Sequence, residues 1–306
     1  RWSAKTKKEM RKRSEIDPDK FASLVVDDEP KYEHNYKSEY RGRVQNRQVE
    51  TSYLPMFQLS YFPNTQNVSG VQAFDKAVED LNQQLSTLAS DPSASGSKAA
   101  AAKGKTSDKV YIVCSKEQLD ENGSMKIFSL IDKLSAELSV AKDIEQKKLI
   151  LMRRAIAHSV LRDFEAAISD FTYYISLDDK NALAYWQRAV CQAEMDEFNK
   201  AEGKGVVNIH SAEADFSDAI RLNSSNAYIY YNRGNLHAGR NELSKAIDDY
   251  TIALKIDNRL AEAYYNRGIA RAKSGNRQAG IQDLSKAGEL GLYDAYSVIK
   301  RLNKAK

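Results

Sequence analysis

The stretch YYNRGNLHAGRN, residues 230–241, returns as YYNRGIARAKSG at residues 264–275. The same five residues open both copies, and the second copy begins 34 positions after the first. Each copy ends in polar turn residues that include glycine, so each reads as a helix followed by a break. A unit that returns at a fixed interval of this length predicts an array of stacked supersecondary units.

Four arginines mark the copies of this unit: Arg154, Arg188, Arg233 and Arg267. Their separations are 34, 45 and 34 residues, which indicates that the second unit carries an insertion of eleven residues. We place this insertion near residues 199–209, NKAEGKGVVNI, because its glycines are typical of a loop.

Each unit contains the pattern of two helices that pack closely. A 3.6-residue spacing of apolar residues is visible in the second helix of each unit, which predicts one buried face. Small residues at fixed positions would let the two helices approach, and bulky residues would fill the layer between them. The small residues are Ala155, Ala189, Gly234 and Gly268, then Ala167, Ala212, Ala246 and Gly280, and the bulky ones are Phe171, Phe216, Tyr250 and Leu284.

This pattern resembles the tetratricopeptide repeat, with four repeat-like units over residues 148–291. The chain departs from the family at the position after each second helix, where proline is common but Asp179, Ser224 and Asn258 stand here. The resemblance implies a mainly α fold, an α-α superhelix or solenoid whose concave groove binds peptides or partner proteins. Residues 292–306 have one apolar helical face and are expected to form a capping helix over the last repeat.

The first half of the chain is irregular in pattern. We expect residues 1–63 to form a linker segment with strands or the end of a preceding repeat array, and residues 64–147 to form a mixed helical segment. The expected strands lie at 21–26, 48–62 and 110–114, the expected helices at 71–85 and 125–138, and the low-complexity stretch at 93–108 reads as a flexible linker.

A second resemblance covers most of the chain. The segment YKSEYRGRVQNRQVETSYLPMFQLSYF, the inserted stretch and the ending LSKAGELGLYDAYSVIKRL are similar to the C-terminal part of long, exported multi-repeat proteins of Bacteroidetes bacteria. That resemblance implies an exported, periplasmic protein; a cytoplasmic location is the alternative.

The four arginines have matching carboxylates on the second helix of their units: Asp170, Asp215, Asp249 and Asp283. Two functions fit this pattern. The arginines could form a ladder that binds anionic ligands, or each could form an internal ion pair that locks two helices together. The matched carboxylates favour the ion pair, and we therefore leave these arginines out of the candidate site.

The position before each arginine is expected to face the groove. It holds Arg153, Gln187, Asn232 and Asn266, and the position before that holds Trp186, Tyr231 and Tyr265 in the last three units. Asn235 shares a helical face with Asn232. An amide side chain donates and accepts hydrogen bonds at once, which suits a peptide backbone. We expect these amides to be exposed, so that their removal would barely affect stability, whereas the aromatic residues fit either the groove or the core.

Composition and motifs argue against catalysis and against several ligands. The net charge of +4 is too mild for a nucleic-acid-binding domain, and the basic run at residues 1–13 reads as a solvated helix end or a phosphate contact. Cys114 and Cys191 cannot form a disulfide framework, although one bridge between them stays open. The four histidines show no metal-ligand or catalytic-triad spacing, and no apolar run reaches the ~18 residues of a membrane span.

We therefore expect a non-enzymatic adaptor, without cofactor or metal, that binds a peptide or protein partner in the concave groove. The alternative is a structural subunit of a larger, envelope-associated assembly. In that case the chain would contact its partners through the N-terminal segment or the inserted loop, and the groove would be filled by the chain itself.

Overall fold

The computed structural model describes residues 52–62, 76–90, 109–114, 119–203 and 209–304. The strand expected at 21–26, the basic run at 1–13 and the linker at 93–108 lie outside these ranges. Residues 52–300 form one compact unit.

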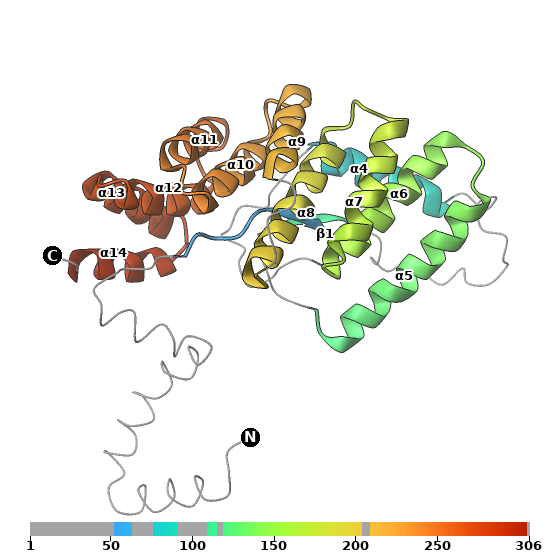
Figure 1. Cartoon of the computed structure of the whole chain (residues 1–306), viewed down its shortest axis with the longest axis horizontal. Coiled ribbons are helices and arrows are strands. Elements are labelled where there is room, and N and C mark those ends of the chain that lie inside the picture. Colours follow the sequence, from blue (N-terminus) through green and yellow to red (C-terminus); the bar gives the residue numbers. More distant parts are fainter. Residues whose placement is uncertain (1–51, 63–75, 91–108, 115–118, 204–208, 305–306) are drawn as a thin grey trace, which may run out of the picture. The chain divides into compact units, whose positions relative to one another are not determined.

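Four helical hairpins follow one another along the chain, and each packs on the next. Figure 1 shows them in sequence order, from the green helices to the red ones. The mainly α solenoid predicted from the 34-residue period is confirmed. The hairpins are α6 (Ile144–Val160) with α7 (Phe164–Leu177), α8 (Ala182–Ala201) with α9 (Ile209–Leu222), α10 (Ala227–Gly239) with α11 (Leu243–Ile256), and α12 (Ala261–Lys273) with α13 (Arg277–Glu289).

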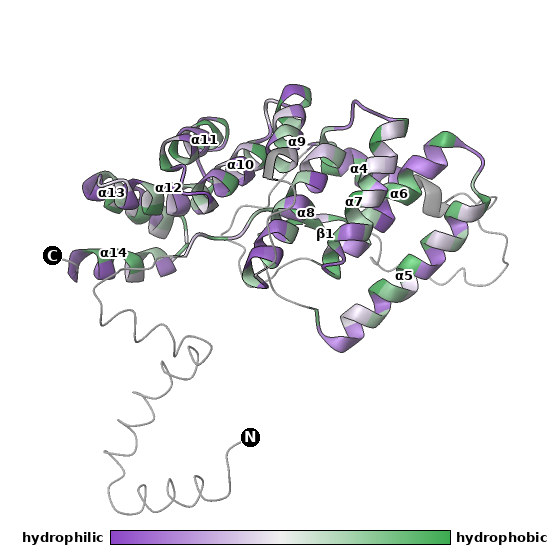
Figure 2. Cartoon of the chain, viewed as in Figure 1, coloured by the Kyte–Doolittle hydropathy of each residue, from purple (hydrophilic) through white to green (hydrophobic). Residues whose placement is uncertain are grey.

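The small residues allow the two helices of a hairpin to touch. A Cβ atom on Gly268 would lie 2.8 Å from the carbonyl oxygen of Gly280, and one on Gly280 would lie 2.6 Å from the carbonyl oxygen of Gly268. Neither position tolerates a larger residue without separating α12 from α13. Each hairpin buries one face in the core and leaves polar residues outside (Figure 2). The predicted bulky layer is completely buried: Phe171, Phe216, Tyr250 and Leu284.

Tight turns close three of the hairpins, and the second hairpin differs. Arg162, Asn241 and Gly275 have positive φ angles just after α6, α10 and α12, the left-handed conformation that ends a helix. In the second repeat, α8 instead continues to Ala201. The first residues of the expected inserted loop are therefore helical; residues 202–203 form a turn, and residues 204–208 lie outside the described part.

Two further helices flank the hairpins. The helix α5 (Glu121–Val140) packs on α6, and its Ser135 hydroxyl accepts a hydrogen bond from Arg154 at 3.0 Å. Thr172 and Thr251 accept equivalent bonds from the arginines of the next hairpins, so α5 takes the place of the second helix of a preceding unit. At the other end, α14 (Asp294–Lys304) buries Ala295 and Val298, the apolar face expected for a cap.

Before the hairpins, the described chain forms α4 (Lys76–Ser90) and a two-stranded antiparallel sheet. In the sheet, β1 (Gln58–Ser60) pairs with β2 (Tyr111–Val113), and Leu59 lies opposite Ile112. Both strands fall within segments predicted as strand-like. The residue before β2 is held by α4, because the Asn82 side chain accepts from the N–H of Val110 at 2.8 Å and donates to its carbonyl at 2.9 Å.

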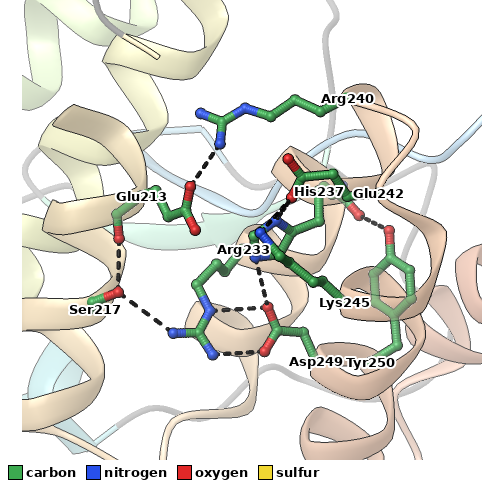
Figure 3. Close-up of polar contacts among 10 residues, drawn as sticks. Glu213, Ser217, Arg233, His237, Arg240, Glu242, Lys245, Asp249 and Tyr250 are labelled. Atoms are coloured by element: carbon green, nitrogen blue, oxygen red, sulfur yellow. Dashed lines mark hydrogen bonds and ion pairs between the residues drawn. The ribbon is translucent and has the colours of Figure 1, made fainter. Parts of the chain in front are cut away.

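The four arginines form bidentate ion pairs with the four predicted aspartates, with N–O distances of 2.7–2.9 Å. Figure 3 shows the level at which Arg233 meets Asp249. The hydrogen bonds that Arg233 donates to Asp249 raise the pKa of Arg233 above its ordinary value. The same view shows His237 bonded to Glu242, at 2.8 Å, at the turn that ends α10. The spacing of residues in the sequence did not predict this contact between His237 and Glu242.

The pair Arg188–Asp215 gives the cleanest test of the ion-pair ladder. Replacing either residue with Ala should cost about 1–3 kcal/mol, because the remaining half-buried charge loses its partner. The double-mutant cycle, measured by urea denaturation, should show a coupling of about 1–2 kcal/mol. The matched control is the surface pair Arg221–Asp218, whose side chains are 65% and 43% exposed; its coupling should stay below about 0.5 kcal/mol. Equal coupling in both cycles would contradict a structural role for the ladder.

Candidate peptide groove and its resident segment

Residues 52–62, with the sequence SYLPMFQLSYF, run in extended form along the first helices of the four repeats. We call them the resident segment. In Figure 1 they are the blue trace that passes α12, α10 and α8. The position that was predicted to face the groove contacts this segment in every repeat.

In the third and fourth repeats, one asparagine side chain bonds to both the backbone N–H and the backbone carbonyl of a single residue of the resident segment. Asn266 Oδ1 accepts from the N–H of Leu54 at 2.8 Å, and its Nδ2 donates to the Leu54 carbonyl at 3.1 Å. Asn232 repeats this arrangement at Phe57, with distances of 2.8 Å and 2.7 Å. Each asparagine therefore acts as one residue of a neighbouring strand would.

The first and second repeats make simpler contacts. Gln187 Oε1 accepts from the N–H of Leu59 at 2.9 Å. The hydroxyl of Tyr61 donates to the backbone carbonyl of Arg153 at 2.9 Å. Positions 54, 57, 59 and 61 thus follow repeats four, three, two and one, so the segment runs antiparallel to the repeat order.

A cluster of polar side chains surrounds the Leu54–Pro55 peptide. The Leu54 carbonyl accepts from Asn235 Nδ2 at 2.9 Å as well as from Asn266. The Tyr231 hydroxyl donates to the Pro55 carbonyl at 3.0 Å and accepts from Asn266 Nδ2 at 2.9 Å. The Cys114 thiol also donates to the Pro55 carbonyl, at 3.2 Å. This cluster joins the third and fourth repeats to β2 through the resident segment.

Aromatic contacts hold the middle of the segment. The ring of Phe57 meets the rings of Tyr228 and Tyr231 edge-on, with centroid distances of 4.7 Å and 5.0 Å. Trp186 stacks on Tyr228 at 6.4 Å. Phe57, Leu59 and Tyr61 are all buried. Trp186, Tyr231 and Tyr265 are buried too, and Tyr231 contacts the resident segment through its hydroxyl and its ring.

The expectation that the groove amides are exposed is wrong. Asn232 and Asn266 have no exposed surface, and Gln187 is almost fully buried. The cause is the resident segment, which covers them. The sequence contained one usable signal, the alternation of apolar residues at Phe57, Leu59 and Tyr61, which predicted the strand but not its location.

Burial sets the ionisation of the groups around the segment. Desolvation raises the pKa of the Cys114 thiol, and the negative charge of Glu262 raises it further. Burial is also the main cause of the raised pKa of Tyr231. Burial raises the pKa of Tyr53 to about 12. All three side chains are therefore neutral at pH 7.

Cys191 provides a prediction about pH. Burial raises its pKa to about 12, while an unfolded thiol titrates near 8.5. Because the folded value is the higher one, this group stabilises the fold fully below the unfolded pKa, and the contribution is lost as pH rises from about 9 to 12. At pH 8, iodoacetamide should therefore modify Cys191 about a thousandfold more slowly in the folded chain than in urea. Mass spectrometry of the labelled peptides measures this ratio; equal rates would contradict the burial.

Within the described ranges, no group of three or more His, Cys, Asp or Glu side chains is placed to hold a metal ion. No helix in the part of the chain that the structure describes is long and apolar enough to cross a membrane.

Comparisons with known proteins agree with the helical-repeat architecture. Residues 239–275 match the family model described as TPR repeat, which supports the resemblance drawn from the 34-residue period. Among curated proteins, no sequence matches this chain.

Three solved structures show the range of similar folds. The crystal structure of MamA is 21% identical, covers 59% of this chain and 99% of its own, and has a TM-score of 0.48. YrrB, described as a TPR protein with an unusual peptide-binding site, is 16% identical, with 60% and 89% covered and a TM-score of 0.44. The first TPR of Spaghetti (RPAP3), bound to an HSP90 peptide, is 22% identical, with 44% and 98% covered and a TM-score of 0.37.

Proposed function

We propose that the chain is a non-enzymatic protein–protein interaction adaptor whose concave groove receives an extended peptide, and that the resident segment occupies this groove in the free protein. One observation carries the proposal: the equivalent position of each of four repeats contacts one continuous extended segment. Arg153, Gln187, Asn232 and Asn266 are those positions, and Trp186, Tyr231, Asn235 and Tyr265 complete the proposed site.

The contacts suit a peptide receptor because the asparagine side chains form hydrogen bonds with the main chain of the segment. Asn232 and Asn266 each satisfy one N–H and one carbonyl of the same residue. Any extended peptide offers these groups, so the groove would bind a partner segment by the same bonds that it makes to residues 54 and 57. A partner would have to replace the resident segment.

The tether makes that replacement costly. A tethered segment has an effective concentration of about 1 mM; if the same segment bound with a dissociation constant of about 1–10 µM when free, a competitor would appear about 100–1000-fold weaker. The groove would therefore be closed to weak ligands and open only to a tight partner or to a chain whose segment has been released.

Cys114 offers a direct readout of this release, because its thiol bonds to Pro55. In the variant Phe57→Ala, the resident segment loses its aromatic anchor. We expect iodoacetamide to label Cys114 at least tenfold faster than in the unmodified chain. Adding a synthetic peptide of residues 52–62 should slow the labelling again, because the peptide refills the groove.

Cys191 serves as the internal control, since it is buried between repeat helices and should stay unlabelled throughout. If Cys114 is labelled faster but the peptide never protects it, while Cys191 stays protected, the groove does not receive peptides in trans. A variant in which both thiols react has unfolded, and Leu59→Ala then takes its place in the same experiment. Unfolding in both variants would assign the segment to the core alone and overturn the receptor proposal.

A structural subunit is the second candidate, and one observation favours it. Leu59 is fully buried in the main core, and β1 is paired with β2, as expected for a permanent part of the fold. In that case partners would contact the N-terminal segment of residues 1–63 or the insertion near 199–209. An exported, periplasmic location rests on the Bacteroidetes resemblance and stays a prediction, which cell fractionation of the source organism would test.

A further inference from the structure

The groove around the resident segment contacts particular side chains of that segment as well as its main chain. Building on the proposed function, we infer that the groove selects a peptide segment of fixed direction, in which an apolar residue and a proline are followed two positions after the proline by an aromatic residue. These positions correspond to Leu54, Pro55 and Phe57, and two features of the groove select them.

The first feature is a carbonyl cradle at Leu54. Its oxygen accepts from Asn235 and Asn266, and Asn235 is itself held by a hydrogen bond from the Tyr250 hydroxyl at 2.7 Å. The next residue, Pro55, has no N–H, and its carbonyl accepts from Tyr231 and Cys114. A proline there leaves no donor to satisfy beside the cradle.

The second feature is the aromatic box of Tyr228 and Tyr231, which meets the Phe57 ring at 4.7 Å and 5.0 Å. The Asn232 side chain bonds to both the backbone N–H and the backbone carbonyl of Phe57. The ring and the backbone are therefore held together, which defines this position as the anchor of the ligand. The cradle and the box hold positions 54 and 57, so two residues separate the cradle residue from the aromatic one.

Direction follows from the same contacts. The cradle combines Asn266 of the fourth repeat with Asn235 of the third, whereas the box and Asn232 belong to the third repeat alone. A ligand must therefore place its N-terminal part toward the fourth repeat. A reversed peptide could reach the box with its ring, but it would present its N–H and carbonyl groups in the wrong order to Asn235 and Asn266.

A competition experiment tests these claims with the Phe57→Ala chain and a fluorescent peptide of residues 52–62. Three unlabelled peptides compete: one with Ala in place of Phe57, one with the reversed sequence, and a control with Ala in place of Gln58, which follows the last anchor and pairs with Val113 of β2. The first two should bind at least about 30-fold more weakly than the native peptide, and the control should stay within about threefold.

If the native peptide binds but the Ala and reversed forms bind equally well, the specificity is overturned while the peptide-receptor proposal stands. If no peptide binds to the loosened chain, the receptor proposal fails first and the specificity fails with it.

Discussion

Replacing Leu59 with Ala should lower the free energy of unfolding by about 2–5 kcal/mol, as for a fully buried core leucine, although Leu59 lies outside all four repeats. Its side chain has no exposed surface and belongs to the same core as the repeat helices. Its N–H is bonded to Gln187. The loss should appear in urea denaturation as a lower midpoint.

The neighbouring residue provides the control. Gln58 lies on the same strand, is half-buried, and points to the opposite side because side chains alternate along a strand. Gln58→Ala should change the free energy of unfolding by less than about 1 kcal/mol. If Leu59→Ala also cost less than about 1 kcal/mol, the resident segment would be a dispensable surface ligand rather than part of the core.

The repeats could be predicted from the sequence because their determinants are local and recur. The 34-residue period, the small residues of each helix pair and the arginine–aspartate matches all lie within one repeat. Gly268 and Gly280 illustrate this: they lie 12 positions apart within one repeat, since 280 − 268 = 12, and the close contact of α12 with α13 follows from both.

The occupant of the groove could not be predicted in the same way. Leu54 and Asn266 are separated by 212 positions, and Phe57 and Asn232 by 175. No periodicity links such positions. The amides were selected for a sound reason, their fit to a peptide backbone, but the peptide turned out to belong to the same chain. Because the resident segment covers these amides, a surface that was expected to be exposed to solvent is a buried interface.

In the second repeat, the sequence predicted the insertion but not which of its residues are helical. The insertion was placed by its glycines, yet α8 runs to Ala201. The residues up to that point are good helix formers, and Gly203 is the first to adopt a positive φ. The length of the insertion was visible from the arginine spacing, whereas its division between helix and turn depended on where the first helix breaker falls.

Replacing Asn232 with Ala should also lower the free energy of unfolding by about 2–5 kcal/mol, the opposite of the small effect expected for an exposed amide. The substitution removes two hydrogen bonds at once and leaves both the N–H and the carbonyl of Phe57 without their partner in a fully buried site. Each unsatisfied buried group costs about 1–3 kcal/mol.

Asn303, which is exposed on α14, is the matched control, and Asn303→Ala should stay within about 0.5 kcal/mol of the unmodified chain. A double mutant separates the two sources of the loss. Once Phe57→Ala has loosened the segment, Asn232→Ala should cost less than it does alone, because the backbone groups at position 57 can then reach water. Losses that add fully would mean that Asn232 stabilises its own helix rather than the resident segment, and the groove amides would lose their assigned role.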